Sequence, residues 1–152
     1  MEVVLKNHPT DARLGTRKLK VGNRFYITED DAARLKVGDE IRLIELYNIK
    51  VKNIDWKNDA SLLITAEAVG DEIQQSMPKV QWIANNDIVD YKVMIPKELY
   101  ISEVEYNTNS LEIAQGFAES FVSRLKRDTR VQFVRFGFCR IDGNQIAIMT
   151  HR

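Results

Sequence analysis

Aromatic, amide and basic side chains alternate closely in residues 131–141. This run, VQFVRFGFCRI, places Gln132, Arg135 and Arg140 among three phenylalanines. Aromatic rings stack on unpaired bases, and a glutamine amide or an arginine guanidinium hydrogen-bonds base edges or phosphates. The combination is therefore typical of a surface that binds single-stranded RNA. The alternative is a strand buried on both faces, with its second face packed against a neighbouring domain.

A second basic segment, GTRKLKV, lies at residues 15–21. Lys18 and Lys20 alternate with apolar residues, as in a strand with one solvent-exposed face. Arg17 falls on the apolar side of this alternation, so its guanidinium needs an acceptor. Two acceptors are open: a carboxylate such as that of Glu45, or a phosphate or base edge of a nucleic acid.

Lys79 is the only basic residue between Lys57 and Lys92, and it follows a polar loop and Pro78. It is placed to reach a phosphate from the start of a strand, or to be an ordinary solvated lysine. Trp82, three residues further on, is interpreted as a core residue rather than a stacking surface.

The distribution of charge supports a polyanionic partner although the net charge is zero. Residues 1–24 carry six basic side chains against two acidic ones, a net charge of +4. Residues 124–152 carry seven against two, a net charge of +5, whereas residues 55–90 carry two against seven, a net charge of −5. If the two ends of the chain meet in space, they form one positive face that can follow a phosphate backbone. Ordinary scatter of surface charge is the alternative.

No motif of a catalytic or metal site is present: the sequence has no Gly-rich phosphate loop, no nucleophile elbow and no paired-histidine metal motif. His8 and His151 are expected to be surface or strand-end residues. The single Cys139 lies in an apolar run, which predicts a buried, inert thiol and excludes an internal disulfide. We therefore expect no catalytic residue, no metal ligand and no cofactor in this chain.

No apolar stretch approaches the roughly 18 to 20 residues that span a bilayer. The first residues also lack the apolar centre of a signal peptide. These observations predict a cytoplasmic protein with no membrane partner.

Runs rich in Val, Ile, Tyr and Phe recur between turn residues, which predicts a mainly β fold. Residues 41–54 and 131–141 are each interpreted as one long strand, the first of them bulged because its apolar alternation changes phase. Turns are expected at Asn58-Asp59 and at Asp142-Gly143-Asn144. Thr28 followed by three acidic residues predicts a short helix, and a second helix is expected at about residues 119–127, after a strand near residues 111–114. The pattern favours two small β-barrels or a sandwich.

Several segments, in order, resemble the C-terminal anticodon-binding region of the class I glutamyl and glutaminyl tRNA synthetases, in the archaeal style. The matching segments are HP-x-D-x-x-LG-x-R (residues 8–17), YNIKV (47–51), VQW (80–82), YN-x-NSLE (106–112) and QF-x-R-x-GF (132–138). The resemblance covers essentially the whole chain, and the order and spacing of the segments are more specific than any one of them. The catalytic signatures of the family, HIGH and KMSKS, are absent.

The resemblance implies two small anticodon-binding β-barrels with one or two short helices. The first barrel is expected at residues 1–95 and the second at residues 96–152, completed by strands from the N-terminal segment. It further implies a tRNA anticodon-binding module of a glutamate–tRNA ligase, non-catalytic by itself, which positions tRNA(Glu), with tRNA(Gln) as a second candidate and no DNA partner. ATP and magnesium would belong to a catalytic domain outside this chain.

The family uses residues matching Arg17, Gln132 and Arg135 to contact anticodon nucleotides. Lys18, Lys20, Lys79 and Arg140 are expected near phosphates. The family carries basic residues in the loop before the strand that matches residues 80–82, and a histidine in that strand. Here the loop is shortened and retains only Lys79, and Gln81 replaces the histidine. Two other functions stay open: a free-standing RNA-binding barrel, and a protein-interaction barrel that docks a partner through residues 133–138.

Overall fold

The computed structural model describes residues 1–57, 61–100 and 102–152. The chain is mainly β and divides into two compact units. The first unit contains Met1, Val3–Lys18 and Gly22–Asn85, and the second contains Glu2, Leu19–Val21 and Asn86–Arg152. The N-terminal hairpin of β1 (Glu2–Lys6) and β2 (Thr16–Lys20) therefore supplies residues to both units.

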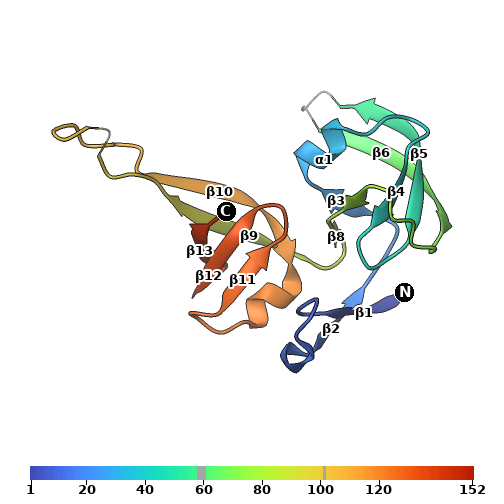
Figure 1. Ribbon diagram of the computed structural model, residues 1–152, viewed down its shortest axis with the longest axis horizontal. Coiled ribbons are helices and arrows are strands. Elements are labelled where there is room, and N and C mark those ends of the chain that lie inside the picture. Colours follow the sequence, from blue (N-terminus) through green and yellow to red (C-terminus); the bar gives the residue numbers. More distant parts are fainter. Residues whose placement is uncertain (58–60, 101) are drawn as a thin grey trace. The chain divides into compact units, whose positions relative to one another are not determined.

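The first unit contains a four-stranded sheet in the order β6-β5-β4-β7 and a two-stranded sheet of β3 and β8. The strands of the larger sheet are β4 (Glu40–Leu43), β5 (Asn48–Trp56), β6 (Leu62–Gly70) and β7 (Lys79–Val80). The smaller sheet pairs β3 (Phe25–Ile27) with β8 (Trp82–Ala84) in antiparallel fashion. Figure 1 shows β5 and β6 as the long strands of this unit.

The prediction of a single strand over residues 41–54 is wrong, but the predicted irregularity occurs within this range, because the register of β5 against β6 shifts between Asn48 and Ile49 and between Val51 and Asn53. β4 and β5 are separate antiparallel strands, with Arg42 paired to Asn48. A tight turn joins them: the Leu43 N–H donates to the Tyr47 carbonyl at 3.0 Å, and Glu45 has a positive φ of 59°. The change of phase in the apolar pattern thus marks a reversal of the chain. The turn expected at Asn58-Asp59 lies outside the described residues.

The helix expected after Thr28 is confirmed as α1 (Glu29–Ala33). The Thr28 hydroxyl oxygen accepts a hydrogen bond from the Asp31 N–H at 3.2 Å. Glu29, Asp30 and Asp31 fill the first turn, where carboxylates interact favourably with the exposed N–H groups. Local capping chemistry is sufficient to begin a helix at this position.

The second unit is built on a five-stranded sheet in the order β10-β9-β13-β12-β11. Its strands are β9 (Ile88–Pro96), β10 (Leu111–Glu119), β11 (Arg130–Phe133), β12 (Gly137–Gly143) and β13 (Ile146–His151). All neighbouring strands are antiparallel except β13 and β9, which are parallel. β9 and β10 form a long hairpin that projects from the rest of the sheet (Figure 1).

The single strand predicted over residues 131–141 is also two strands. β11 and β12 pair as a tight hairpin in which Phe133 lies opposite Gly137. The Phe136 N–H donates to the Phe133 carbonyl at 2.9 Å, and Arg135 occupies the turn with a φ of 65°. This turn explains why aromatic residues occur in both phases of the sequence pattern: the strand direction reverses between them.

The second predicted helix is only partly correct. β10 continues through Glu119, beyond the predicted strand near residues 111–114, and a short 3-10 helix, η2 (Ser120–Arg124), follows it. Only Val122 of this helix is buried. Cross-strand pairing with β9 extends to Glu119 opposite Ile88, so the helix begins one residue later than predicted, and it already ends at Arg124. The turn predicted at Asp142-Gly143-Asn144 is confirmed between β12 and β13.

The core of the second unit lies under one face of the five-stranded sheet. It contains alternate residues of β9, β12 and β13 together with one residue each of β10 and η2, namely Tyr91, Val93, Ile95, Cys139, Ile141, Ala147, Met149, Ala118 and Val122. Cys139 is 1% exposed, which confirms the predicted buried thiol. Burial raises the pKa of this thiol, because the low-dielectric core disfavours the thiolate. The opposite face of β11, β12 and β13 is left to solvent.

None of the sheets formed by the described residues closes on itself. The part of the chain that the structure describes has no helix of the length and hydropathy that a bilayer crossing requires.

Candidate nucleic-acid interface

A row of three side chains crosses the solvent-facing side of β11, β12 and β13. Gln132 on β11 pairs with Phe138 on β12, and Phe138 pairs with His151 on β13. Residues directly opposite in antiparallel strands project from the same face. Cys139, the neighbour of Phe138 along β12, is buried in the core, so Phe138 and Gln132 point outward. The pairing of β12 with β13 shifts by one residue between Phe138 and Cys139, and the stacked rings place His151 on the same face as Phe138.

The Phe138 ring stacks on the His151 imidazole, with ring centroids 4.4 Å apart and planes at 12°. Phe138 remains 39% exposed. The Thr150 hydroxyl donates to the Phe138 carbonyl at 3.1 Å and lies 3.1 Å from His151 Nδ1, which supports the pair. Two parallel rings at the surface offer a base a flat aromatic partner.

Arg130 and Arg140 form the next row toward the other end of these strands. Arg140 Nη1 lies 2.5 Å from Asp128 Oδ1, and the two side chains are 41% and 66% exposed. Arg127 pairs with Asp142 at 3.4 Å in a similar solvated setting. Exposed ion pairs contribute at most about 1 kcal/mol, so a phosphate can compete with the carboxylates for these arginines.

Arg135 stands at the tip of the β11–β12 hairpin and is exposed. Gly137, immediately after the turn, allows β12 to approach β13 closely. A Cβ atom at this position would lie 3.0 Å from the His151 carbonyl oxygen and 3.0 Å from Met149 Cε. The absence of a side chain at Gly137 therefore permits the close approach of the two strands that carry Phe138 and His151. Gln132, Arg135 and Arg140 are thus brought onto one hairpin of the second unit.

Phe133 does not belong to this solvent-facing surface. It packs against the core, and its ring meets the Tyr91 ring edge-on at 5.7 Å. Residues 133–138 span a turn and project in different directions, so they do not form the continuous docking strand of the protein-interaction alternative.

The three basic residues of β2 have different surroundings. Arg17 is half-buried, and its Nη1 donates to the Lys6 carbonyl of β1 at 2.7 Å. Lys18 and Lys20 are exposed, in agreement with the alternation of the sequence. Arg17 and Lys18 are grouped with the first unit and Lys20 with the second. The proximity of Arg17 to Arg135, which would follow if the two basic ends of the chain meet, stays a prediction.

Lys79 begins β7 in the first unit and is exposed. It pairs with Arg42 of the parallel strand β4. Trp82 is buried: its Nε1 donates to the Ile44 carbonyl at 2.9 Å, and its ring meets the Phe25 ring edge-on at 5.3 Å. The prediction that Trp82 is a core residue is confirmed.

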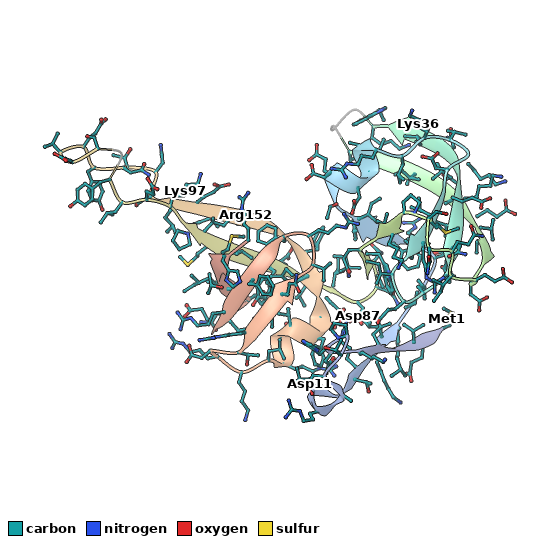
Figure 2. All side chains as sticks on the ribbon, in the orientation of Figure 1. Met1, Asp11, Lys36, Asp87, Lys97 and Arg152 are labelled. Atoms are coloured by element: carbon teal, nitrogen blue, oxygen red, sulfur yellow. The ribbon has the colours of Figure 1, made fainter. Side chains whose placement is uncertain are left out.

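The HP-x-D segment builds the turn between β1 and β2. His8 Nδ1 accepts the backbone N–H of Asp11 at 2.9 Å and that of Thr10 at 3.2 Å. Asp11, labelled in Figure 2, in turn caps the short 3-10 helix η1 (Ala12–Leu14) and pairs with Arg13 at 2.8 Å. Its hydrogen bonds with Arg13 lower the pKa of Asp11. His8 and Asp11 therefore shape the loop that precedes Arg17.

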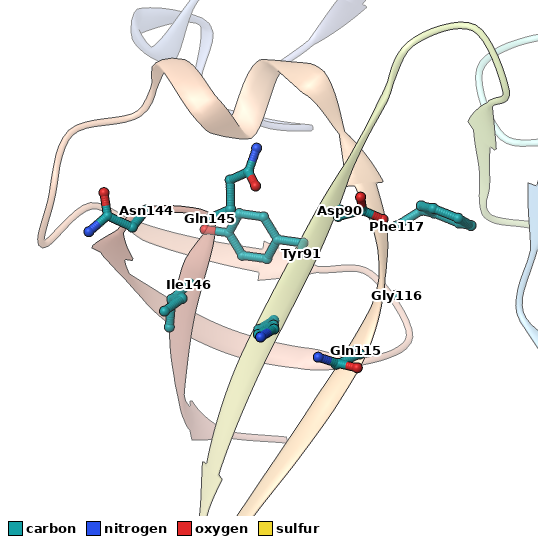
Figure 3. A pocket seen from close by; sticks show the side chains of 9 residues that line it. Asp90, Tyr91, Gln115, Gly116, Phe117, Asn144, Gln145 and Ile146 are labelled. Carbon is teal, nitrogen blue, oxygen red and sulfur yellow. The ribbon is translucent and has the colours of Figure 1, made fainter.

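A pocket of about 620 Å³ lies elsewhere in the second unit (Figure 3). Its polar lining comes from three elements: Asp90, Tyr91 and Lys92 of β9, Gln115 of β10, and Asn144 and Gln145 of the β12–β13 turn. None of the binding residues predicted from the sequence lines it. Among the described residues, no group of three or more His, Cys, Asp or Glu side chains is arranged to hold a metal ion.

Two members of the solvent-facing surface were not identified from the sequence pattern. His151 reads as an ordinary strand-end residue, and Phe138 cannot be told apart from Phe133 and Phe136. Their partnership depends on the pairing of β12 with β13, which brings together residues 13 positions apart. The only local indication is that Phe138 directly precedes Cys139, because neighbouring residues of a strand point to opposite faces.

Both halves of the chain match one protein family, described as tRNA synthetases class I (E and Q), anti-codon binding domain. Residues 1–69 match one part of this family and residues 79–142 match another. The chain therefore belongs to the anticodon-binding region of the class I glutamyl and glutaminyl tRNA synthetases.

Within that class the chain is similar to glutamate–tRNA ligases of archaea. It is 36% identical over 150 residues to the enzyme of Nitrosopumilus maritimus and 33% identical over 147 residues to that of Cenarchaeum symbiosum. It is 31% identical over 142 residues to the enzyme of Methanocaldococcus jannaschii. These matches cover 99%, 97% and 91% of this chain, but 25%, 25% and 22% of the relatives. The chain thus spans about a quarter of the length of these proteins. The resemblance inferred from the sequence is confirmed.

Proposed function

We propose that this chain is the part of a glutamate–tRNA ligase that binds the anticodon of the tRNA. The proposal is carried by the row Gln132, Phe138 and His151, a stacking surface beside a base-edge hydrogen-bonding group. Arg135 and Arg140 flank this row and supply positive charge. These are the groups by which proteins recognise unstacked nucleotides in RNA loops.

We assign the residue roles from side-chain chemistry and from the resemblance to the family. Gln132 and Arg135 read base edges, and Arg17 serves the same purpose from β2. Lys18, Lys20, Lys79 and Arg140 neutralise phosphates. The expected partner is tRNA(Glu), with tRNA(Gln) as a second candidate. The ligase reaction itself requires ATP and magnesium in a catalytic domain outside this chain, and its setting is the cytoplasm.

We further propose that the two units are the two small β-barrels of the anticodon-binding region. The bounds expected from the sequence for these barrels are residues 1–95 and 96–152, the second completed by N-terminal strands, whereas the two units divide between Asn85 and Asn86. The grouping of Leu19–Val21 with the second unit agrees with a contribution of β2 to both parts.

The test is a titration of the chain with tRNA(Glu) and with a tRNA(Glu) whose anticodon is substituted, at the same stated salt concentration. Tighter binding of the native anticodon is expected, because each lost base contact removes about 1 to 3 kcal/mol. Equal affinity for the two would reject base reading. Equal binding of an unrelated single strand would favour a general RNA-binding function instead.

A further inference from the structure

A buried arginine in the first unit holds both ends of residues 71–78, the segment that leads into Lys79. Arg42, on β4, is 8% exposed. Its Nη1 donates to the carbonyl oxygen of Asp71 at 3.0 Å, at the start of the segment. Its backbone N–H donates to the carbonyl oxygen of Pro78 at 2.8 Å, at the end of the segment. A single residue therefore fixes both ends.

Asn48, on β5, completes this arrangement and is 4% exposed. Its Oδ1 accepts a hydrogen bond from Arg42 Nη1 at 2.9 Å, and its Nδ2 donates to the carbonyl oxygen of Glu72 at 2.8 Å. The amide uses its acceptor and its donor at the same time. An aspartate could accept from Arg42 but could not donate to Glu72.

The burial of Arg42 calls for a reason other than core packing. Taking a guanidinium out of water is unfavourable unless its N–H groups are hydrogen-bonded. The acceptors of its Nη1, the Asn48 amide and the Asp71 carbonyl, are neutral. These neutral acceptors attract the guanidinium less than a carboxylate would. The arrangement does, however, give a hydrogen-bond donor to a backbone carbonyl of an irregular segment that has no strand partner there.

The segment held in this way has an exposed surface. Ile73 is 69% exposed, and Gln74 and Gln75 are also exposed. A turn hydrogen bond from the Met77 N–H to the Gln74 carbonyl, 3.2 Å long, shapes its middle. Directly after it, Lys79 pairs with Arg42 in the parallel register of β7 and β4. The position of Lys79 is therefore tied to the same residue that holds the segment.

We propose that Arg42, together with Asn48, is a positioning residue for tRNA binding. It fixes the path of residues 71–78 and so places Lys79 against the RNA backbone, without contacting RNA itself. This inference rests on the proposed tRNA-binding function and goes beyond it by assigning a role to a buried network in the first unit.

The test uses the 152-residue chain and four single variants: Asn48→Asp, Arg42→Met, Lys79→Ala and a matched control, Asn53→Asp. Asn53 lies on the same strand, is exposed, and bonds only locally, through Nδ2 to Asp55 Oδ2 at 2.8 Å. The control therefore introduces the same negative charge without touching the segment. Asn48→Asp keeps the acceptor for Arg42, so it remains usable if Arg42→Met does not fold.

Two readouts are combined. Hydrogen exchange of the free chain is expected to accelerate in residues 71–78 in Asn48→Asp and to stay unchanged there in Asn53→Asp. In tRNA binding, Lys79→Ala is expected to lower the slope of log K against log salt concentration by about 0.7 to 0.9, the value for one phosphate contact. Asn48→Asp should lower it by a similar amount in the parent chain and by almost nothing in the Lys79→Ala background.

Full additivity of Asn48→Asp and Lys79→Ala would overturn the positioning role while leaving tRNA binding intact. An unchanged exchange rate in residues 71–78 would overturn it as well. If Lys79→Ala has no effect on a chain that binds tRNA, the contact assigned to Lys79 is wrong and this inference is wrong with it. Absence of tRNA binding by the parent chain even at low salt would instead reject the proposed function on which it rests.

Discussion

The imidazole of His151 and the ring of Phe138, on adjacent strands, stack face to face with a centroid distance of 4.4 Å. Neither ring belongs to the core, although Cys139, the neighbour of Phe138, and Met149, two residues before His151, are buried there. An aromatic pair on a solvent-facing sheet surface exposes apolar area that water solvates poorly. A stacked base would cover it, which makes this pair the first target for mutation.

Replacing His151 or Phe138 by alanine is expected to weaken tRNA binding by roughly 1 to 3 kcal/mol, the usual contribution of one base stacked on an aromatic ring. Binding titrations at fixed salt measure the effect. Phe117→Ala is the matched control, because Phe117 is a 49% exposed phenylalanine on β10 of the same sheet. A larger loss in the control than in either variant would show that the stacked pair is not the contact surface.

Arg135→Ala should weaken binding of tRNA(Glu) by about 1 to 3 kcal/mol and also reduce the preference for its anticodon. The reason is that a guanidinium at a hairpin tip can approach a base edge with two parallel N–H donors. The measurement is the ratio of Kd values for native and anticodon-substituted tRNA. Arg127→Ala, which removes an exposed arginine paired with Asp142 at the other end of β12, serves as the comparison. An unaltered ratio would remove Arg135 from the base-reading residues.

Lys18→Ala should weaken binding of all tRNAs by a similar factor and lower the salt dependence by about one phosphate contact. A lysine ammonium is a flexible point charge, so it adds affinity for a phosphate without distinguishing bases. Titrations of two tRNAs over a range of salt concentrations test this. A change that is specific to one anticodon would instead assign base recognition to Lys18.

The stability of the folded chain should fall as the pH rises into the alkaline range. Burial raises the pKa of Cys139, and burial followed by the nearby Cys139 charge raises the pKa of Tyr91. In the unfolded chain the thiol of Cys139 and the hydroxyl of Tyr91 have pKa values of about 8.5 and about 10. The folded chain holds its protons to higher pH, so unfolding releases protons in this window and becomes easier as the pH increases.

The measurement for this prediction is the free energy of unfolding by denaturant at several pH values from 7 to 10. In Cys139→Ala the fall that begins near pH 8.5 should be shallower, because the thiol contribution is gone. The comparison concerns the slope with pH, since the substitution also removes core volume. A parent curve that is flat or rising over this range would contradict the prediction.

Local chemistry in the sequence was sufficient for several features. The hydroxyl of Thr28 followed by three acidic residues placed α1, since capping involves only neighbouring residues. Asp142-Gly143-Asn144 placed the turn between β12 and β13, where Gly143 and Asn144 have positive φ values. Alternation placed Lys18 and Lys20 in solvent on β2 and Cys139 in the core.

Other features were decided by contacts between distant residues. Nothing near Arg135 or Glu45 indicates a reversal of the chain, because neither turn contains glycine at its positive-φ position. The strands that follow stabilise these turns by pairing. In the predicted second helix, Glu119 pairs with β9 at the end of β10, and only the short 3-10 helix Ser120–Arg124 follows in place of the longer helix.

By itself the sequence determined the β class, the family and the candidate residues Gln132, Arg135 and Lys79, because these depend on residue type and order. Tertiary structure alone decided that Phe138 meets His151 and that Arg42 reaches Asp71. Strand register and the path of an irregular segment are set by the sum of many long-range contacts. A linear pattern does not specify which of those contacts form together.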